Sequence, residues 1–416
     1  MDEPRGFLLE LFRCAVAAAQ PREAMATRLP DPPVGRTVVL GAGKAAASMA
    51  AALEDRWSGG VSGLVVVPYG HTVPTRRIEV VEAAHPVPDA NGLEAAGRII
   101  ALAEEAGPDD LVICLISGGA SALLTLPAAG VTLADKRSIN EQLLRAGVPI
   151  HDMNIVRKCL SGLKGGRLGA AISPASALTL LISDVPGDEP GVIGSGPTVA
   201  DASATADAAA AISDRYGIDL PPGVAAAMVG NPPVADLPPN QQVRLVAAPR
   251  LSLQAAAERA RALGVKPVVL GDALAGEAGQ VAQTMAQTVR EARARRDFTP
   301  AGCVLLSGGE TTVTLGDSRG RGGRNGEFLL ALALALAGEE VYALACDTDG
   351  IDGSEDNAGA VIDPTTIQRA IDSGLDPERS LLHHDSYGIF SALGDLVVTG
   401  PTMTNVNDFR AIYVPG

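Results

Sequence analysis

Residues 36–51 read RTVVLGAGKAAASMAA, a short stretch that contains a complete structural unit. An apolar, β-branched run leads through Gly41, Gly43 and Lys44 into an alanine-rich segment, which is typical of a strand, a tight turn and a helix. The spacing Gly41-x-Gly43-x-x-Ala46 meets the loose dinucleotide-binding pattern, whereas Gly-Lys is also found in phosphate-binding loops. The two interpretations predict different enzymes.

The same order of strand and helix repeats on both sides of this stretch. The runs TVVL, GLVVV, IEVVEA, LVICLIS and ALTLLIS are typical of buried strands, and helical patterns at 90–106 and 132–146 separate several of them. After the proline-rich segment NPPVADLPPN the alternation resumes. We therefore expect two α/β domains, residues 1–235 with a Rossmann-like, mostly parallel sheet and residues 236–416.

Composition excludes several classes of protein. With 416 residues the chain is long enough for two hydrophobic cores, and 47% of its residues are hydrophobic. A net charge of -15 and an aromatic content of 3% argue against nucleic-acid binding, which needs a basic surface and stacking platforms. The five cysteines are dispersed, so neither a zinc site nor a redox pair is expected.

No targeting or membrane segment is expected from the sequence. The chain begins MDEP, without a basic and then apolar segment. The apolar run FLLALALALA at 328–337 is about half of the roughly 20 residues that span a membrane. We expect a cytoplasmic protein without a membrane partner; a homodimer is compatible with the sequence, which leaves the oligomeric state open.

The GAGK turn lacks the second element of a dinucleotide site. An acidic residue is required about 20 positions on, at the end of the next strand, to bind the ribose. That strand ends in Pro68 and Tyr69, and the full phosphate-loop spacing is absent as well. A glycine turn, a helix N-terminus and Lys44 together suit an isolated phosphate or carboxylate. The alternative is that Gly41 and Gly43 only permit close packing.

Two further segments of the first domain carry glycine and polar side chains. SGGAS at 117–121 follows a strand and offers backbone N–H groups, although Ser117 lacks the nucleophile-elbow pattern and also suits a helix cap. In VRKCLSGLKGGRL at 156–168, four cations gather around a glycine pair. A solvated helix face is the ordinary explanation of such a run, and the glycine pair beside Lys164 indicates close approach to an anion as the alternative.

Acidic residues follow a strand in ISDVPGDEPGVIGSGPT at 182–198. Asp184, Asp188 and Glu189 are suited to holding magnesium or to accepting a proton. The second domain adds SGGETTVTLGDSRGRGGRNGEF at 307–328, in which Arg324 is expected at a helix N-terminus that favours an anion.

Five acids crowd into DTDGIDGSEDN at 347–357, without the spacing of an EF-hand. Anion sites and strand-end carboxylates on two α/β domains are the parts that phosphoryl transfer requires. His85 is present, but no Ser/His/Asp set is evident, which disfavours a hydrolase.

Together these motifs resemble the glycerate 2-kinase family, whose C-terminal part is the MOFRL domain. The resemblance rests, in chain order, on GAGKAAASMA, HPVPDANG, LISGGASALL, RKCLSGLKGGRL, ISDVPGDEPGVIGSGPT, SGGETTVTLG, GRGGRNGEF, DTDGIDGSEDNAGA and TGPTMTNVNDF. It implies phosphorylation of D-glycerate at its 2-hydroxyl with ATP and Mg2+, which gives 2-phosphoglycerate and ADP. Members are often labelled hydroxypyruvate reductases, so an NAD(P)H-dependent reductase and a non-catalytic sugar-acid-binding protein remain the alternatives.

The resemblance also implies the site residues, in a cleft between a Rossmann-like domain and a MOFRL-type domain. The catalytic residues it implies are Lys44, Arg324, Asp184 and Asp349, with Asp188 and Asp352 as metal ligands. The general base stays open among Asp184, Asp188, Asp349 and Asp352. The substrate- and nucleotide-binding residues are Gly41, Gly43, Ser117, Gly118, Gly119, Lys164, Gly165, Ser195, Ser307, Gly308, Gly309, Glu310, Asn325, Thr402 and Asn405. Departures from the family pattern occur at Ala120, Cys159 and Met403.

Overall fold

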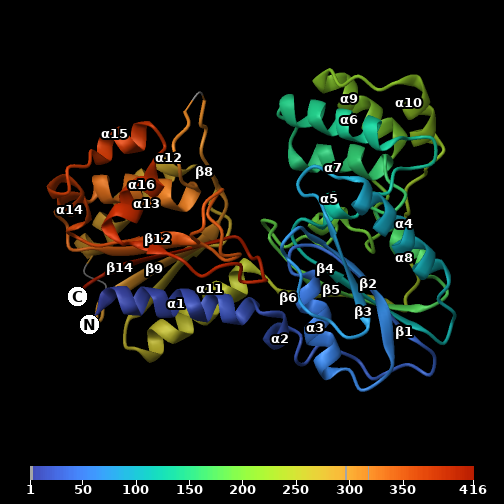
Figure 1. Ribbon diagram of the computed structural model, residues 1–416, viewed down its shortest axis with the longest axis horizontal. Helices are drawn as coiled ribbons and strands as arrows, with labels where there is room; N and C mark the ends of the chain where they lie inside the picture. Colours follow the sequence, from blue (N-terminus) through green and yellow to red (C-terminus); the bar gives the residue numbers. More distant parts are fainter. Residues whose placement is uncertain (1–2, 296–297, 317) are drawn as a thin grey trace. The chain divides into compact units, whose positions relative to one another are not determined.

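The structure is a computed structural model that describes residues 3–295, 298–316 and 318–416 (Figure 1). Its contacts divide the chain into two compact units. The N-terminal unit is Pro21–Val246, and the C-terminal unit consists of the residues up to Gln20 together with Ala247–Gly416. Each unit is built around its own six-stranded sheet.

The sheet of the N-terminal unit has the strand order β3-β2-β1-β4-β5-β6. Strand β1 pairs in parallel with both β2 and β4, and the pairs β2–β3 and β4–β5 are parallel too. The mostly parallel sheet expected from the sequence is thereby confirmed. The strands are β1 Thr37–Ala42, β2 Val61–Pro68, β3 Ile78–Ala83, β4 Leu111–Ile116, β5 Ser176–Ile182 and β6 Gln241–Ala247.

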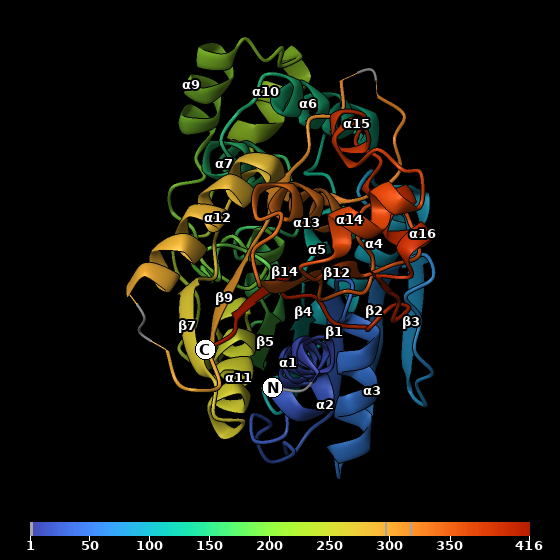
Figure 2. The same cartoon turned by 90° about the vertical axis from the view of Figure 1, so that its left-hand side faces the viewer.

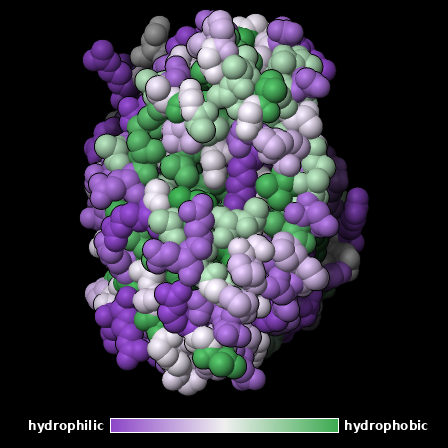
Figure 3. Space-filling model, turned by 90° about the vertical axis from the view of Figure 1, so that its right-hand side faces the viewer, coloured by the Kyte–Doolittle hydropathy of each residue, from purple (hydrophilic) through white to green (hydrophobic). Residues whose placement is uncertain are grey.

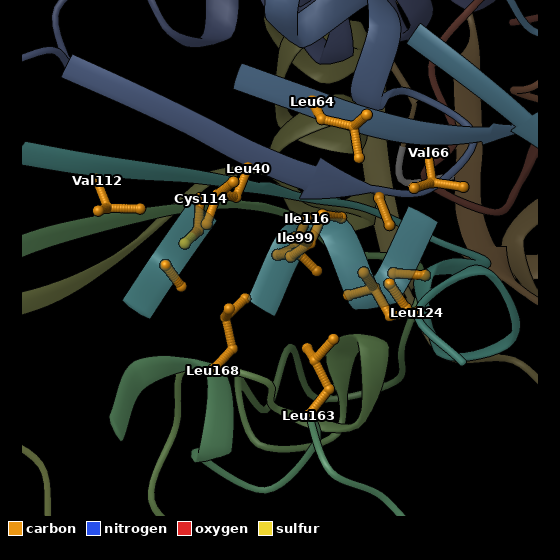
Figure 4. Packing of buried hydrophobic residues seen from close by; sticks show 14 of the residues in the cluster. Leu40, Leu64, Val66, Ile99, Val112, Cys114, Ile116, Leu124, Leu163 and Leu168 are labelled. Carbon is orange, nitrogen blue, oxygen red and sulfur yellow. The ribbon is translucent and has the colours of Figure 1, made fainter. Parts of the chain in front are cut away.

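The core of this unit lies between the sheet and a layer of helices. Figure 4 shows side chains of the strands, such as Leu40 and Ile116, packed with Ile99 of a helix and with Leu163 and Leu168 of the segment below. All of them are fully or almost fully buried. The helices are α2 Pro21–Ala24, α3 Ala46–Arg56, α4 Ala90–Glu104, α5 Ala120–Leu123, α6 Leu133–Arg145, α7 Ile150–Cys159, α8 Arg167–Ile172, η1 Ile193–Ser195, α9 Ala206–Tyr216 and α10 Pro222–Val229.

Helices α6, α7, α9 and α10 form a separate helical group in this unit, which is visible in Figure 1. Their apolar faces share a buried cluster that includes Ile139, Val156 and Ile212. The group gives α6 and α7 a rigid support, so side chains on their other faces are held in place.

The sheet of the C-terminal unit is mixed, with the strand order β13-β12-β11-β14-β9-β7. Strand β7 pairs in parallel with β9, and the pairs from β9 through β14, β11 and β12 to β13 are antiparallel. The strands are β7 Lys266–Gly271, β9 Cys303–Gly309, β11 Tyr342–Asp347, β12 Gly359–Ile362, β13 Leu396–Val397 and β14 Asp408–Val414, with β8 Gly276–Glu277 and β10 Thr311–Thr312 in a separate ribbon.

Helices cover both faces of the mixed sheet (Figure 2). Helices α12 and α13 share one buried cluster with strand residues such as Leu305 and Ile412, and α1 and α11 share the other with Leu306 and Phe409. The helices of this unit are α1 Pro4–Ala19, α11 Pro249–Ala262, α12 Ala278–Arg295, α13 Arg324–Ala335, α14 Thr366–Asp372, α15 Pro377–Leu382 and α16 Ser386–Leu393.

The structural division differs from the boundary expected at residue 235 in two places. Strand β6 lies beyond that boundary but extends the parallel sheet beside β5, because its backbone completes that edge. Helix α1 precedes the parallel sheet in the chain, yet its apolar face packs on α11 and β14. The pairing of β6 with β5 and the packing of α1 on the C-terminal unit are long-range contacts, which local periodicity in the sequence does not indicate.

Within the described residues no helix is long and apolar enough to cross a membrane. Hydrophilic and hydrophobic residues are interspersed on the molecular face shown in Figure 3, which is ordinary for a folded protein surface. The five cysteines are free thiols, and four of them are buried.

Candidate functional site

The GAGK turn of the N-terminal unit is bonded to the neighbouring strand end. Strands β1 and β4 are adjacent, so their carboxyl ends meet at Ala42 and Ile116. Ser117 N donates to Ala42 O at 3.1 Å, and Lys44 N donates to Gly118 O at 2.9 Å. The SGG and GAGK segments predicted as separate anion sites therefore form one structure at the edge of the sheet.

Close packing accounts for the glycines and for Ser117. Gly43 has a φ of +129°, and a Cβ there would lie 2.2 Å from Ser117 Oγ. The hydroxyl of Ser117 accepts the N–H of Ala45 at 3.0 Å, and Gly43 N donates to Val66 O at 3.0 Å. These amides point into the protein, whereas a dinucleotide-binding turn directs its amides to the pyrophosphate.

Lys44 follows the turn and is half-buried. It lies close enough to His85 to affect its titration: burial is the main cause that lowers the pKa of His85, and the positive charge of Lys44 adds to it. The imidazole also lies against Gly119, where a Cβ would be 3.1 Å from the ring. Lys44, His85 and Gly119 thus share one neighbourhood.

The KGG and GSG segments also meet. Gly165 N donates to Ser195 O at 3.1 Å, and Gly166 N donates to Gly196 O at 2.8 Å. Lys164 is almost fully buried, and its ammonium donates to Ser121 O at 2.6 Å and to Leu124 O at 2.8 Å. The predicted binding residues Lys164, Gly165 and Ser195 are therefore brought together within this unit.

The four cations of 156–168 have different surroundings. Lys158 is paired with Asp201 at 2.6 Å, and the guanidinium of Arg167 donates to Asn231 Oδ1 and to backbone carbonyls. Arg157 donates from Nε to Asn140 Oδ1 at 2.7 Å. Lys158 and Arg167 thus hold the segment in place, and among the described residues only Lys158 of these four cations has a carboxylate partner.

The acidic loop after β5 is partly exposed to solvent. Asp184 is half-buried two residues beyond the strand, and Asp188 is half-buried at a φ of +54°. Asp188 N donates to Val185 O at 3.1 Å, which closes a turn. The loop presents these two predicted carboxylates at the same edge of the sheet as the GAGK turn.

A second cluster of predicted residues surrounds Arg324 in the C-terminal unit. The guanidinium contacts three carboxylates, those of Glu310 at 2.6 Å, Asp347 at 2.8 Å and Asp408 at 2.9 Å. Glu310 follows β9, Asp347 ends β11 and Asp408 begins β14. Antiparallel pairing places Asp408 opposite both Asp347 and Gly309, so the three strand ends meet beneath the arginine.

Burial affects the ionisation of the side chains in this cluster. It raises the pKa of Asp347, and the neighbouring carboxylates of Asp349 and Asp408 raise it further. Although burial opposes it, the three carboxylates raise the pKa of Arg324. Arg410, which is fully buried, donates to Asp408 at 2.6 Å as a second cation. The positive charge of Arg324 opposes this rise in the pKa of Asp347.

Asp352 caps the helix that begins at Arg324. Its carboxylate accepts Asn325 N at 3.0 Å and Gly326 N at 2.8 Å, and Asn325 Nδ2 donates to Asp408 at 2.8 Å. Burial raises the pKa of Asp352 to about 6. A Cβ on Gly323 would lie 2.3 Å from this carboxylate, so the glycine permits the approach. Both oxygens serve the helix N-terminus, and a metal role for Asp352 stays a prediction.

The remaining predicted residues line the same strand ends. Ser307, Gly308 and Gly309 end β9, and Gly309 has a φ of +119° where a Cβ would lie 2.2 Å from Leu274 N. Thr402 N donates to Asp349 O at 2.9 Å, which joins two predicted residues. Asn405 Oδ1 accepts Asn407 N at 3.1 Å, within the loop that leads into β14.

Sequence reasoning missed several residues that the structure places at these sites. Asp408 and Arg410 belong to NDFRAIYV, where charges at alternate positions of an otherwise apolar strand were an available signal. Lys136 lies on α6 near Arg157 and was not distinguishable from a solvated helix residue. Among the described residues, no group of three or more His, Cys, Asp or Glu is arranged to hold a metal ion.

Comparisons with known proteins cover nearly the whole chain. Residues 7–229 match a domain of unknown function (DUF4147), and residues 303–408 match the MOFRL family. A putative hydroxypyruvate reductase from Agrobacterium vitis is 53% identical over 99% of this chain and 94% of the relative. A glycerate 2-kinase from Pyrococcus horikoshii is 37% identical over 96% of this chain and 94% of its own.

A solved structure is similar in fold as well. The crystal structure of a glycerate kinase from Thermotoga maritima superimposes with a TM-score of 0.91, at 34% identity, over 98% of this chain and 99% of the other. This similarity covers both units.

Proposed function

Because the chain belongs to the glycerate 2-kinase family, we propose that it transfers the terminal phosphoryl group of ATP to the 2-hydroxyl of D-glycerate, giving 2-phosphoglycerate and ADP. The relatives carry two kinds of label, kinase and putative hydroxypyruvate reductase. A reductase needs a dinucleotide site, and the GAGK turn is the segment that would form it.

The inward-facing amides of that turn are the observation that favours the kinase. Gly43 N, Lys44 N and Ala45 N are all bonded to groups of neighbouring strand ends. The next strand, β2, ends at Pro68 without a carboxylate for the ribose. What the turn does present is the ammonium of Lys44, a point charge that suits a phosphoryl group.

The proposed roles follow from charge. Lys44 and Arg324 are the cations proposed to neutralise charge on the phosphoryl group as it moves from donor to acceptor. Three carboxylates fix the orientation of Arg324, and its side chain is 25% exposed, which leaves part of it accessible to a substrate. The base that accepts the hydroxyl proton is one of the carboxylates after β5 or β11, and Asp184 and Asp349 are the candidates.

We also propose a need for magnesium. This ion keeps several waters in kinases and takes only one or two protein carboxylates, so a dedicated cage is unnecessary. Asp188 is better placed than Asp352, because the oxygens of Asp352 already accept backbone N–H groups. When bound, the ion neutralises phosphate charge. Activity is expected to stop with EDTA and return with added magnesium; full activity in metal-free buffer would remove Asp188 from this role.

The test of the reaction uses purified protein with each substrate pair. With ATP and D-glycerate, ADP should form together with a product that enolase converts to phosphoenolpyruvate, which identifies 2-phosphoglycerate. Hydroxypyruvate should not oxidise NADH or NADPH. Reductase activity without ADP formation would reverse the assignment, and glycerate binding without either turnover would indicate a binding protein.

A further inference from the structure

A cavity of about 460 Å³ lies within the N-terminal unit, between helices α6 and α7 and the segments 85–88 and 119–125. Pockets of ~300–1,000 Å³ are usual for ligands of nucleotide size. Much of the wall is aliphatic. The aliphatic side chains are Val87, Leu133, Ile139, Leu143, Leu144 and Leu160.

Four cations line the same cavity: Lys136 and Arg137 from α6, Arg157 from α7 and Lys164 from the loop after α7. Among the described lining residues only Glu141 has a carboxylate; its side chain is 73% exposed and lies 3.7 Å from Arg145 on the same helix. The cavity therefore combines an excess of positive charge with an apolar wall.

The four cations differ in the hydrogen bonds that they make, and Arg137 donates to Pro88 O. Lys164 donates to two carbonyls, and Arg157 donates to Asn140. The ammonium nitrogen of Lys136 is buried and has no hydrogen-bond partner in the described part of the chain. A buried charge without a partner is unfavourable, and an anion bound in the cavity would supply a partner for this lysine.

The lowered pKa values of the two lysines agree with this geometry. Burial lowers the pKa of Lys136 to about 7, and the nearby charge of Arg157 lowers it further. Burial is also the main cause that lowers the pKa of Lys164, with Lys136 and Arg157 adding to it. The three groups repel one another, and a multiply charged anion would relieve this repulsion.

The identity of the anion follows from charge and size. A three-carbon acid carries one negative charge and would leave most of the cavity empty. A nucleotide has phosphates for the cations and a base for the aliphatic wall. We propose that this cavity binds the adenine nucleotide, with its phosphates at Lys136, Arg157 and Lys164 and its base against the leucines; the inference rests on the proposed kinase function.

The position of the cavity suits this role. His85 and Gly119 line it, and both also adjoin the GAGK turn, since His85 senses the charge of Lys44. A nucleotide whose phosphates lie in the cavity would therefore reach the neighbourhood of Lys44. Leu163 anchors the segment that carries Lys164 in the core, which holds the cation in place (Figure 4).

The test measures ADP binding to the full chain by calorimetry, without glycerate. Lys136→Met keeps the length of the side chain but removes one charged contact, so the Kd for ADP should rise by roughly tenfold or more. Arg145→Gln is the matched control, because it removes an exposed cation from the same helix outside the cavity. Its Kd should equal that of the wild type.

A second variant tests whether the nucleotide base lies against the aliphatic wall. Leu144 is 58% exposed at the rim, so Leu144→Trp is compatible with folding, and its emission should change when ADP is added. Unchanged ADP affinity in Lys136→Met, or a rise in the KM for glycerate alone, would overturn the proposal. If ADP binds in a Lys136-dependent manner but glycerate is not phosphorylated, the proposed function fails and the nucleotide site stands.

Discussion

The contacts of Arg324 and Lys44 determine which of the two cations is better suited to a test by substitution. Arg324 is tied to three carboxylates, of which Asp408 is fully buried, so removing Arg324 would leave acids unpaired and would confuse folding with catalysis. Lys44 follows a turn whose backbone is bonded independently of its side chain. Lysine 44 is therefore the clearer test of charge neutralisation.

Lys44→Met is expected to lower kcat far more than it raises the KM for either substrate. The reason is that phosphoryl charge is neutralised more strongly in the transition state than in the ground state. Loss of one preorganised contact costs on the order of 3 kcal/mol, roughly a hundredfold in rate. Steady-state kinetics in both substrates measure it, with Lys266→Met on β7 as control and a melting curve for folding. Near-normal turnover in a folded Lys44→Met would reduce GAGK to a packing turn.

Helix α13 depends on a cap from another part of the chain. Asp352 accepts the N–H groups at the start of the helix, and the same helix start carries Arg324 and Asn325, which bind Asp408. The arrangement of the whole cluster therefore follows from how one helix begins. The stability of this cluster is expected to depend on pH because the capping group, the Asp352 carboxyl, can ionise.

We expect the free energy of unfolding of the wild type, minus that of Asp352→Asn, to decrease as the pH rises from about 4 to about 6. The folded-state pKa of Asp352 is raised from 3.8 to about 6, so the folded protein binds this proton more tightly than the unfolded chain. Its contribution is fully present below the unfolded pKa and is lost as pH rises through the folded pKa. Urea unfolding at several pH values measures the difference, and the exposed Asp356→Asn serves as control. A difference that increases over this range would contradict the raised pKa.

At the scale of the molecule, the first helix belongs with the C-terminal unit. The side chain of Phe12 is 2% exposed and lies 5.9 Å, between ring centroids, from Phe409 of β14. Ser252 of α11 donates to Ala15 O at 2.8 Å. The C-terminal unit is thus completed by residues that are made first.

Phe12→Ala is expected to destabilise the C-terminal unit by about 3–5 kcal/mol, since it leaves a cavity against β14. Hydrogen exchange should show lower protection in β11 and β14 and unchanged protection in β1 and β4, because the two units have separate cores. Arg13→Ala, an exposed change on the same helix, should leave both unchanged. Equal loss of protection in β1 would mean that the units unfold as one.

The elements and the family were predictable because their signals are local. Strands β1, β2, β3, β4 and β5 fall where apolar runs predict them, and α4 and α6 lie within a few residues of their predicted ranges. Tight turns such as Gly43 and Gly309 show in the sequence because their backbone conformations require glycine. These features need no knowledge of distant residues.

The sequence by itself therefore determined the α/β class and the family, and it predicted the segments proposed to carry the chemistry. Only the tertiary structure decided which side chains meet: Arg324 with Asp408, which are 84 residues apart, and Lys136 with Arg157 and Lys164 around one cavity. It also decided that α1 joins the C-terminal unit and that β6 completes the sheet of the N-terminal unit. The physical reason is that pairing and burial are set by long-range packing, which local periodicity does not record.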